Sequence, residues 1–245
     1  MPLSYPELLR HHGLVEETRN REQRIIFGSY PGIVVNPADA RRNLEELAHS
    51  YLLKDVLNLE GVRKPKVLQN IVFALAHQTG SEVSLSELGQ TTGADRTTVD
   101  RYITILEQAF IVFSLPSYST NERAEVRKRK KVYFYDNGML NAVRHDVDPF
   151  ALRAPGEIGP LWENYLVSER TKLLVNRSFG PQQYFWRNTA QAEVDYIESG
   201  ARSLHAWEFK WNSRTRAKLP AAFRNLYPEA VFDTVTPDTV GEFLV

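Results

Sequence analysis

Residues 63 to 110 contain helical segments separated by strong helix-stop signals, and this order constrains the fold more than any other part of the sequence. Apolar residues recur at helical spacing in residues 67–75 and again in residues 99–110. Ser84, with Glu87 three residues later, forms a capping box for a short helix. Gly93 marks a turn that favours a left-handed residue, and Asp95 then caps a longer helix. This spacing predicts a helix-turn-helix.

In a helix-turn-helix bound to DNA, the start of the last helix faces the major groove. The side chains at these positions can reach phosphates and base edges, and they are Arg96, Thr97, Thr98 and Arg101. The sequence therefore predicts DNA contact here. A three-helix bundle used for protein contact is the alternative interpretation.

Two β-rich runs follow, at residues 111–113 and 132–135, and they bracket a polar loop. The basic residues predicted to contact phosphates there are Arg127, Lys128, Arg129, Lys130 and Lys131. Two strands joined by a basic tip after a helix-turn-helix predict a winged helix, in which each phosphate contact adds to the salt dependence of binding. A charged loop that only faces solvent is the alternative.

Composition limits the remaining function classes. Lys plus Arg and Asp plus Glu are both 30, so the formal net charge is zero and any nucleic-acid surface must be local. The absence of cysteine excludes disulfides and thiolate chemistry and fits a reducing cytoplasm. No Gly-Lys pair of a phosphate-binding loop occurs, so we expect no ATPase activity from this chain alone. Without a long apolar run or a secretory signal, we expect a soluble, cytoplasmic protein with no membrane partner.

A stretch rich in proline and glycine at residues 148–160 predicts a domain boundary. We expect an α+β chain with a helical segment at 1–62, a winged helix-turn-helix at 63–150 and an α/β domain at 151–245.

The last of these regions carries a group of charged residues with a possible chemical role. Glu163 lies near the start of a predicted helix from residue 161 to about 175, and Asp195 lies on a predicted strand. On the next strand, Glu208 and Lys210 share one face because strand side chains alternate. Asp195 and Glu208 are predicted to bind Mg²⁺, and Lys210 to orient water or neutralise charge on a phosphate. A surface ion pair between Glu208 and Lys210 is the alternative.

In this order, Glu163, Asp195 and Glu208-Phe209-Lys210 resemble the PD-(D/E)xK nuclease superfamily, with Val194 where the proline of that name would stand. The resemblance implies acidic residues that bind magnesium and a lysine that assists phosphodiester hydrolysis, with Glu163 as the helical carboxylate. Glu169 is a rival for that helical position.

The whole chain also resembles bacterial and archaeal AAA+ ATPases whose C-terminal part is a conserved domain of unknown function. The matching segments lie at residues 2–8, 28–31, 51–56, 131–138, 162–164 and 193–195. The resemblance implies that the helical segment at 1–62 is similar to an ATPase lid. It also implies an ATPase core that this chain lacks, supplied in cis or in trans.

We therefore expect a DNA-binding module of an AAA+ ATPase-like protein with a nuclease-like domain. Whether it is a Mg²⁺-dependent DNA endonuclease is left open. The alternatives are a catalytically inactive DNA-binding protein and a protein-interaction module that works with a separate ATPase core.

Overall fold

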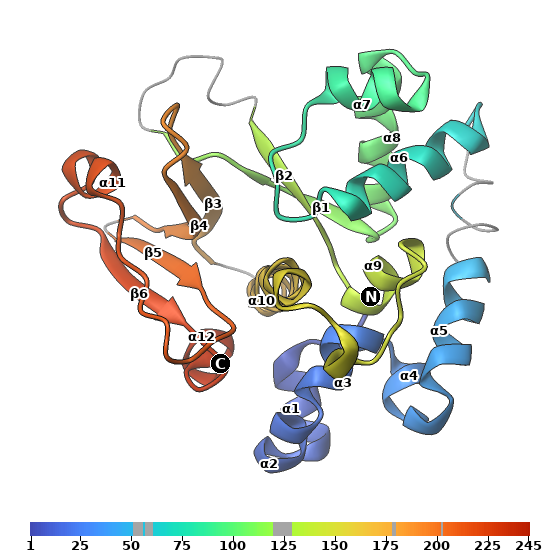
Figure 1. Ribbon diagram of the computed structural model, residues 1–245, viewed down its shortest axis with the longest axis horizontal. Coiled ribbons are helices and arrows are strands. Elements are labelled where there is room, and N and C mark those ends of the chain that lie inside the picture. Colours follow the sequence, from blue (N-terminus) through green and yellow to red (C-terminus); the bar gives the residue numbers. More distant parts are fainter. Residues whose placement is uncertain (51–55, 57–60, 120–128, 178–179, 202) are drawn as a thin grey trace.

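The computed structural model describes the 245-residue chain except residues 51–55, 57–60, 120–128, 178–179 and 202. A long helix, α10 (Pro155–Asn176), lies between a mainly helical half and a four-stranded sheet (Figure 1). No helix in the described ranges combines the length and the apolar character needed to cross a bilayer.

The helical half is built from short helices on both sides of the segment at 51–60. In chain order these are α1 (Tyr5–His12), α2 (Leu14–Arg19), α3 (Arg21–Phe27), α4 (Pro31–Val34), η1 (Pro37–Asp39), α5 (Ala40–Leu47), α6 (Pro65–His77), α7 (Leu85–Thr92), α8 (Arg96–Gln108), α9 (Asn137–Val143) and η4 (Phe150–Leu152).

The local signals predicted between α7 and α8 are present. The Ser84 hydroxyl accepts a hydrogen bond from Glu87 N at 3.3 Å, which caps α7. Gly93 has φ 72° and ψ 32°, the left-handed conformation that ends a helix. Asp95 Oδ1 accepts from Thr98 N at 2.9 Å and caps α8. The helix–turn–helix order is therefore as predicted.

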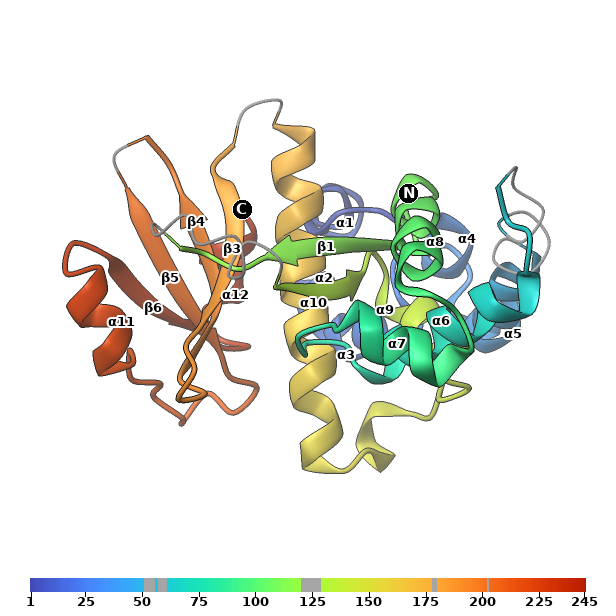
Figure 2. The ribbon, with the colours of Figure 1, turned by 90° about the horizontal axis from the view of Figure 1, so that it is seen from above.

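The two β-rich runs form an antiparallel hairpin of β1 (Val112–Pro116) and β2 (Lys130–Phe134). The hairpin crosses α10 and reaches the large sheet (Figure 2), where Tyr118 N donates to Phe185 O at 2.7 Å. The sequence predicts a basic tip at Arg127 to Lys131, and of these residues Arg127 and Lys128 lie outside the part of the chain that the structure describes.

The four-stranded sheet has the order β3 (Gln182–Arg187), β4 (Glu193–Ser199), β5 (Leu204–Phe209) and β6 (Val231–Val235). The first three strands are antiparallel neighbours, and β6 runs parallel to β5 after the crossover helix α11 (Ala221–Leu226). The side chain of Phe223 on α11 covers one face of the sheet. The other face packs against α10 and α12 (Val240–Leu244).

One hydrophobic core runs from the helical half into the sheet. It joins Tyr5 of α1, Trp162 of α10 and Phe243 of α12, all of which are buried. The core therefore crosses the boundary predicted between residues 150 and 151. The reason is that α10 packs against both halves. This helix begins at Pro155, six residues before the predicted start at Leu161.

Candidate functional site

A β-bulge sets the position of Asp195 on β4. Asp195 and Tyr196 together face one residue of β3, because the flanking pairs are Tyr184↔Ile197 and Trp186↔Val194. A bulge interrupts the alternation of side chains and re-aims one of them. Here it leaves Val194 and Tyr196 in apolar clusters on opposite faces of the sheet and turns Asp195 towards β5.

Where β4 and β5 separate, the Asp195 carboxylate of β4 accepts a hydrogen bond from the backbone of β5. The last residue pair between these strands is Tyr196↔Trp207. Beyond it, Asp195 Oδ2 accepts a hydrogen bond from Phe209 N at 2.8 Å. Asp195 therefore helps to hold β5 against β4.

Glu208 of β5 and Lys210, the first residue after this strand, lie on one side, as the alternation predicts. Lys210 Nζ donates to Glu208 Oε2 at 2.9 Å, while Trp207 and Phe209 are buried in the core on the other side. Burial opposes the charge on Lys210, but the bond to Glu208 and the nearby charge of Asp195 raise its pKa above the ordinary value.

Glu163 of α10 is held by side chains of β2. Its Oε1 accepts from Lys131 Nζ at 3.0 Å and from the Tyr133 hydroxyl at 2.6 Å. Lys131 also forms an ion pair with Glu193 at the start of β4. The Lys131 side chain is fully buried, so it differs from the phosphate-contacting role predicted with the basic loop. The pairing of β2 with β1 points it towards α10 and the sheet instead of solvent.

Four carboxylates lie near Lys131 or Asp195, and we call Glu163, Glu193, Asp195 and Glu208 the carboxylate cluster. Burial raises the pKa of Asp195 well above its ordinary value, and repulsion from Glu163 and Glu208 raises it further. Lys131 works in the opposite direction on Asp195. Burial also opposes the charged form of Lys131, but the charges of Glu163, Glu193 and Asp195 raise its pKa above the ordinary lysine value.

The predicted magnesium site does not fit this arrangement. Mg²⁺ needs carboxylate oxygens that converge in octahedral geometry and keep room for water. Here Lys131, Phe209 N and Lys210 already donate to Glu163, Asp195 and Glu208, respectively. Within the described ranges, no group of three or more His, Cys, Asp or Glu side chains is arranged to hold a metal ion.

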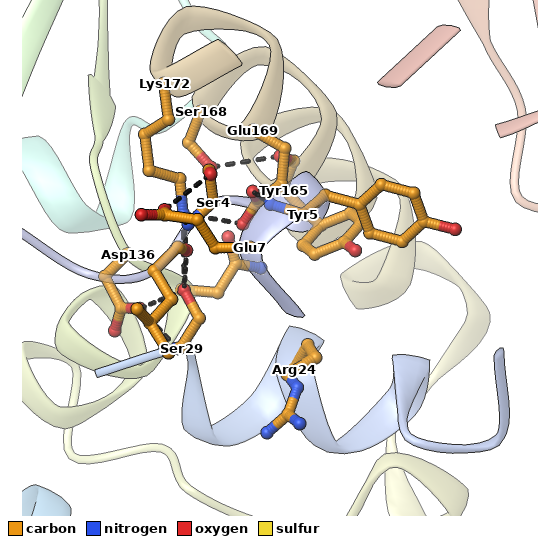
Figure 3. Close-up of polar contacts among 12 residues, drawn as sticks. Ser4, Tyr5, Glu7, Arg24, Ser29, Asp136, Tyr165, Ser168, Glu169 and Lys172 are labelled. Atoms are coloured by element: carbon orange, nitrogen blue, oxygen red, sulfur yellow. Dashed lines mark hydrogen bonds and ion pairs between the residues drawn. The ribbon is translucent and has the colours of Figure 1, made fainter. Parts of the chain in front are cut away.

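Glu169, the rival for the helical carboxylate, belongs to a different polar network (Figure 3). It is buried and accepts from Tyr5 N at 2.7 Å and from Lys172 Nζ at 2.6 Å. Glu163 is therefore the α10 carboxylate that lies with Asp195. The spacing of Glu169 and Lys172, three residues apart on a helix, is the sequence signal for this pair.

The residues predicted to contact nucleic acid lie at the start of α8 and near the hairpin. Arg96, Thr97 and Arg101 are exposed, whereas the Thr98 hydroxyl donates to Asp95 Oδ2 at 2.7 Å as part of the helix cap. Arg129 and Lys130 are half-buried and lie near carboxylates, at 3.8 Å from Glu82 and 3.6 Å from Asp100. Among the predicted nucleic-acid contacts that the structure describes, the exposed basic side chains are therefore Arg96 and Arg101 of α8.

Comparison with known families assigns both halves of the chain to domains of unknown function. Residues 18–149, more than half of the chain, match the domain of unknown function DUF8612, and the chain belongs to this family. Residues 158–238 match a second domain of unknown function, DUF4143, which is often found C-terminal to AAA-type ATPase domains. Neither match identifies a nuclease or an ATPase family.

The curated relatives are longer proteins, each described as uncharacterised. Proteins of Mycobacterium tuberculosis and Mycobacterium bovis are each 30% identical over 179 residues, which is 72% of this chain and 38% of theirs. A Haemophilus influenzae protein is 23% identical over 148 residues, 56% of this chain and 37% of its own. This chain thus spans less than two-fifths of the length of these relatives.

A search of solved structures finds a Vibrio cholerae protein at 11% identity and a TM-score of 0.27, covering 91% of this chain and 54% of that one. A TM-score this low does not establish a shared fold.

Proposed function

We propose that this chain is the duplex-DNA-binding part of a larger, ATPase-linked protein. The observation that carries the proposal is the exposed start of α8, where Arg96, Thr97 and Arg101 follow the left-handed turn at Gly93. Because the Asp95 carboxylate already accepts from Thr98 N at this helix start, the attraction for phosphate would come from the Arg96 and Arg101 side chains. The adjacent β1–β2 hairpin supports a winged-helix interpretation, with Arg127 and Lys128 as further proposed contacts.

The double variant Arg96→Gln/Arg101→Gln tests this proposal. Each phosphate contact contributes about 0.9 to the slope of log affinity against log salt, so we expect the slope to fall by about 2 and the affinity to fall with it. Fluorescence anisotropy with a labelled duplex at several salt concentrations measures both quantities.

The matched control is Arg224→Gln, because Arg224 is also exposed but lies on α11 beyond the sheet (Figure 1). It should leave the slope and the affinity unchanged. An equal loss in both variants would mean that binding is unspecific attraction to positive charge. Failure of the wild-type chain to bind a duplex would contradict the proposal directly.

Magnesium-dependent phosphodiester hydrolysis is the second candidate function. What favours it is the meeting of Glu163, Asp195 and Glu208 beside Lys210, on elements that follow the order helix, three strands, helix, strand. This is the set that the resemblance to PD-(D/E)xK nucleases implies, with Mg²⁺ as the cofactor. It has less support than DNA binding because Lys131 already pairs with Glu163 and Glu193.

We expect supercoiled plasmid to remain intact when it is incubated with the wild-type chain and Mg²⁺ or Mn²⁺. The variant Asp195→Asn, which keeps an oxygen able to accept from Phe209 N, is the control for contaminating nucleases. Nicking by both proteins would come from a contaminant. Nicking by the wild type alone would establish hydrolysis at Asp195.

We propose that an AAA+ core acts with this chain in cis or in trans, supported by the DUF4143 match and by the greater length of the relatives. A protein-interaction role with such a core is the alternative if no duplex binds. We propose a cytoplasmic location, supported by the absence of cysteine from the sequence.

A further inference from the structure

Lys131 is the residue that links the hairpin to the carboxylate cluster. Its Nζ pairs with Glu163 of α10 and Glu193 of β4, and it lies 5.3 Å from the centre of the Phe185 ring on β3. One ammonium thus joins β2 to three elements on the other side of the core. Its side chain has no exposed surface, although lysine is rarely fully buried.

A buried lysine of this kind needs compensating anions, and the anions in turn need a cation. Removing a charge from water costs several kcal/mol, and a buried ion pair offsets this cost only with good geometry and further hydrogen bonds. The Tyr133 hydroxyl supplies one such bond to the same Glu163 oxygen, at 2.6 Å. In return, Lys131 reduces the repulsion that Asp195 experiences from Glu163 and Glu208.

The helical half also covers Glu163 from the other side. Gly80, in the turn after α6, has φ +79°, and a Cβ placed there would lie 3.2 Å from Glu163 Oε2. The Glu163 carboxylate, whose side chain is 17% exposed, therefore lies between this turn, Lys131 and Tyr133. A hydrated divalent cation would have to compete with the ammonium for its Oε1 oxygen.

We propose that the Lys131 ammonium occupies the cation position of the carboxylate cluster, so that a nuclease-like set of carboxylates serves as an ionic clamp between the hairpin and the sheet. The lysine is covalently tethered beside its anions, so a free cation competes with a ligand at high effective concentration. The inference goes beyond the proposed DNA binding and does not depend on it, because the α8 residues take no part in the clamp.

Titration with Mn²⁺, in the absence of nucleic acid, tests the clamp. We compare the wild type with Lys131→Met, which keeps the length of the side chain but removes its charge, by calorimetry and by thermal unfolding with and without Mn²⁺. We expect the variant to bind Mn²⁺ on the order of tenfold more tightly than the wild type or better, and to gain thermal stability on Mn²⁺ addition that the wild type does not gain.

The matched control is Lys130→Met, the adjacent lysine on β2, whose side chain is 22% exposed and faces Asp100 at 3.6 Å. It should behave as the wild type in both measurements. If Lys131→Met does not fold without metal, Lys131→Met/Glu193→Gln removes one anion with the cation and should still bind Mn²⁺ more tightly than the wild type, by a smaller factor because one carboxylate is lost.

Two results would overturn the proposal. The first is a wild type that already binds Mn²⁺ as tightly as the Lys131 variants, because the cation position would then be free. The second is a folded Lys131 variant, single or double, that gains no Mn²⁺ affinity. Both results concern metal alone, so they are distinct from any failure of DNA binding.

Discussion

Alanine at Gly28 should destabilise the fold by about 3 kcal/mol or more, measured by urea or thermal denaturation. Gly28 has φ 76° and ψ −163°, a combination essentially limited to glycine. An added Cβ would also lie 2.5 Å from Cγ of Asp136. The backbone strain and the overlap each contribute about 1–3 kcal/mol to this loss.

Asp136 is unable to move away from such a Cβ at low cost. It is buried, its Oδ2 accepts from Ser29 N at 2.7 Å, and its Oδ1 accepts from Met139 N at 2.9 Å, which caps α9. Any rotation of the carboxyl group would leave these N–H groups without their acceptor. Movement of the Asp136 side chain therefore cannot relieve the overlap with a Cβ at Gly28 at a low cost in free energy.

Gly32, four residues further on, is the matched control. It lies within α4, and a Cβ there would meet nothing within 4 Å. Gly32→Ala should leave stability within about 0.5 kcal/mol or raise it slightly, because alanine favours the helix. Equal losses at Gly28 and Gly32 would mean that the contact with Asp136 is unimportant.

The second large effect is expected at Lys172 of α10. Lys172→Met should cost about 3–5 kcal/mol, because it leaves a buried carboxylate without its cation. Lys172 Nζ donates to Glu169 Oε1 at 2.6 Å, to Leu3 O at 2.9 Å and to Ser29 Oγ at 3.2 Å (Figure 3). The lysine thus ties two segments of the helical half to α10.

The pH dependence of this loss identifies its electrostatic origin. Burial raises the pKa of Glu169 even in the wild type, while Lys172 opposes that rise. Without the lysine, Glu169 is expected to fold in its protonated form, and at pH 7 the unfolded chain must first take up that proton. The loss at Lys172→Met should therefore be smaller near pH 4.5 than at pH 7.

Two further variants separate charge from packing. Lys66→Met removes an exposed lysine from α6 and should change stability by no more than about 0.5 kcal/mol. Lys172→Met/Glu169→Gln removes both charges, so it should recover part of the loss seen at pH 7. A double variant no more stable than the single one would assign the effect to lost packing and hydrogen bonds instead.

The sequence alone determined the features that depend on neighbouring residues. Gly93 and Asp95 locate the turn and the start of α8, because a left-handed residue and a helix cap are local requirements. The two-residue alternation of strands likewise places Glu208 and Lys210 on one side, with Phe209 on the other. Both features follow from backbone geometry and need no distant partner.

Only the tertiary structure decided where distant charges meet. Lys131 stands in a run of basic residues, and nothing in its neighbours distinguishes it from Lys130, yet strand pairing and the packing of α10 bury one and leave the other half-buried. The bulge that re-aims Asp195 depends on its register with β3. Burial depends on the packing of the whole chain. It places Lys131, predicted to contact phosphate, among the carboxylates as the cation that holds them together.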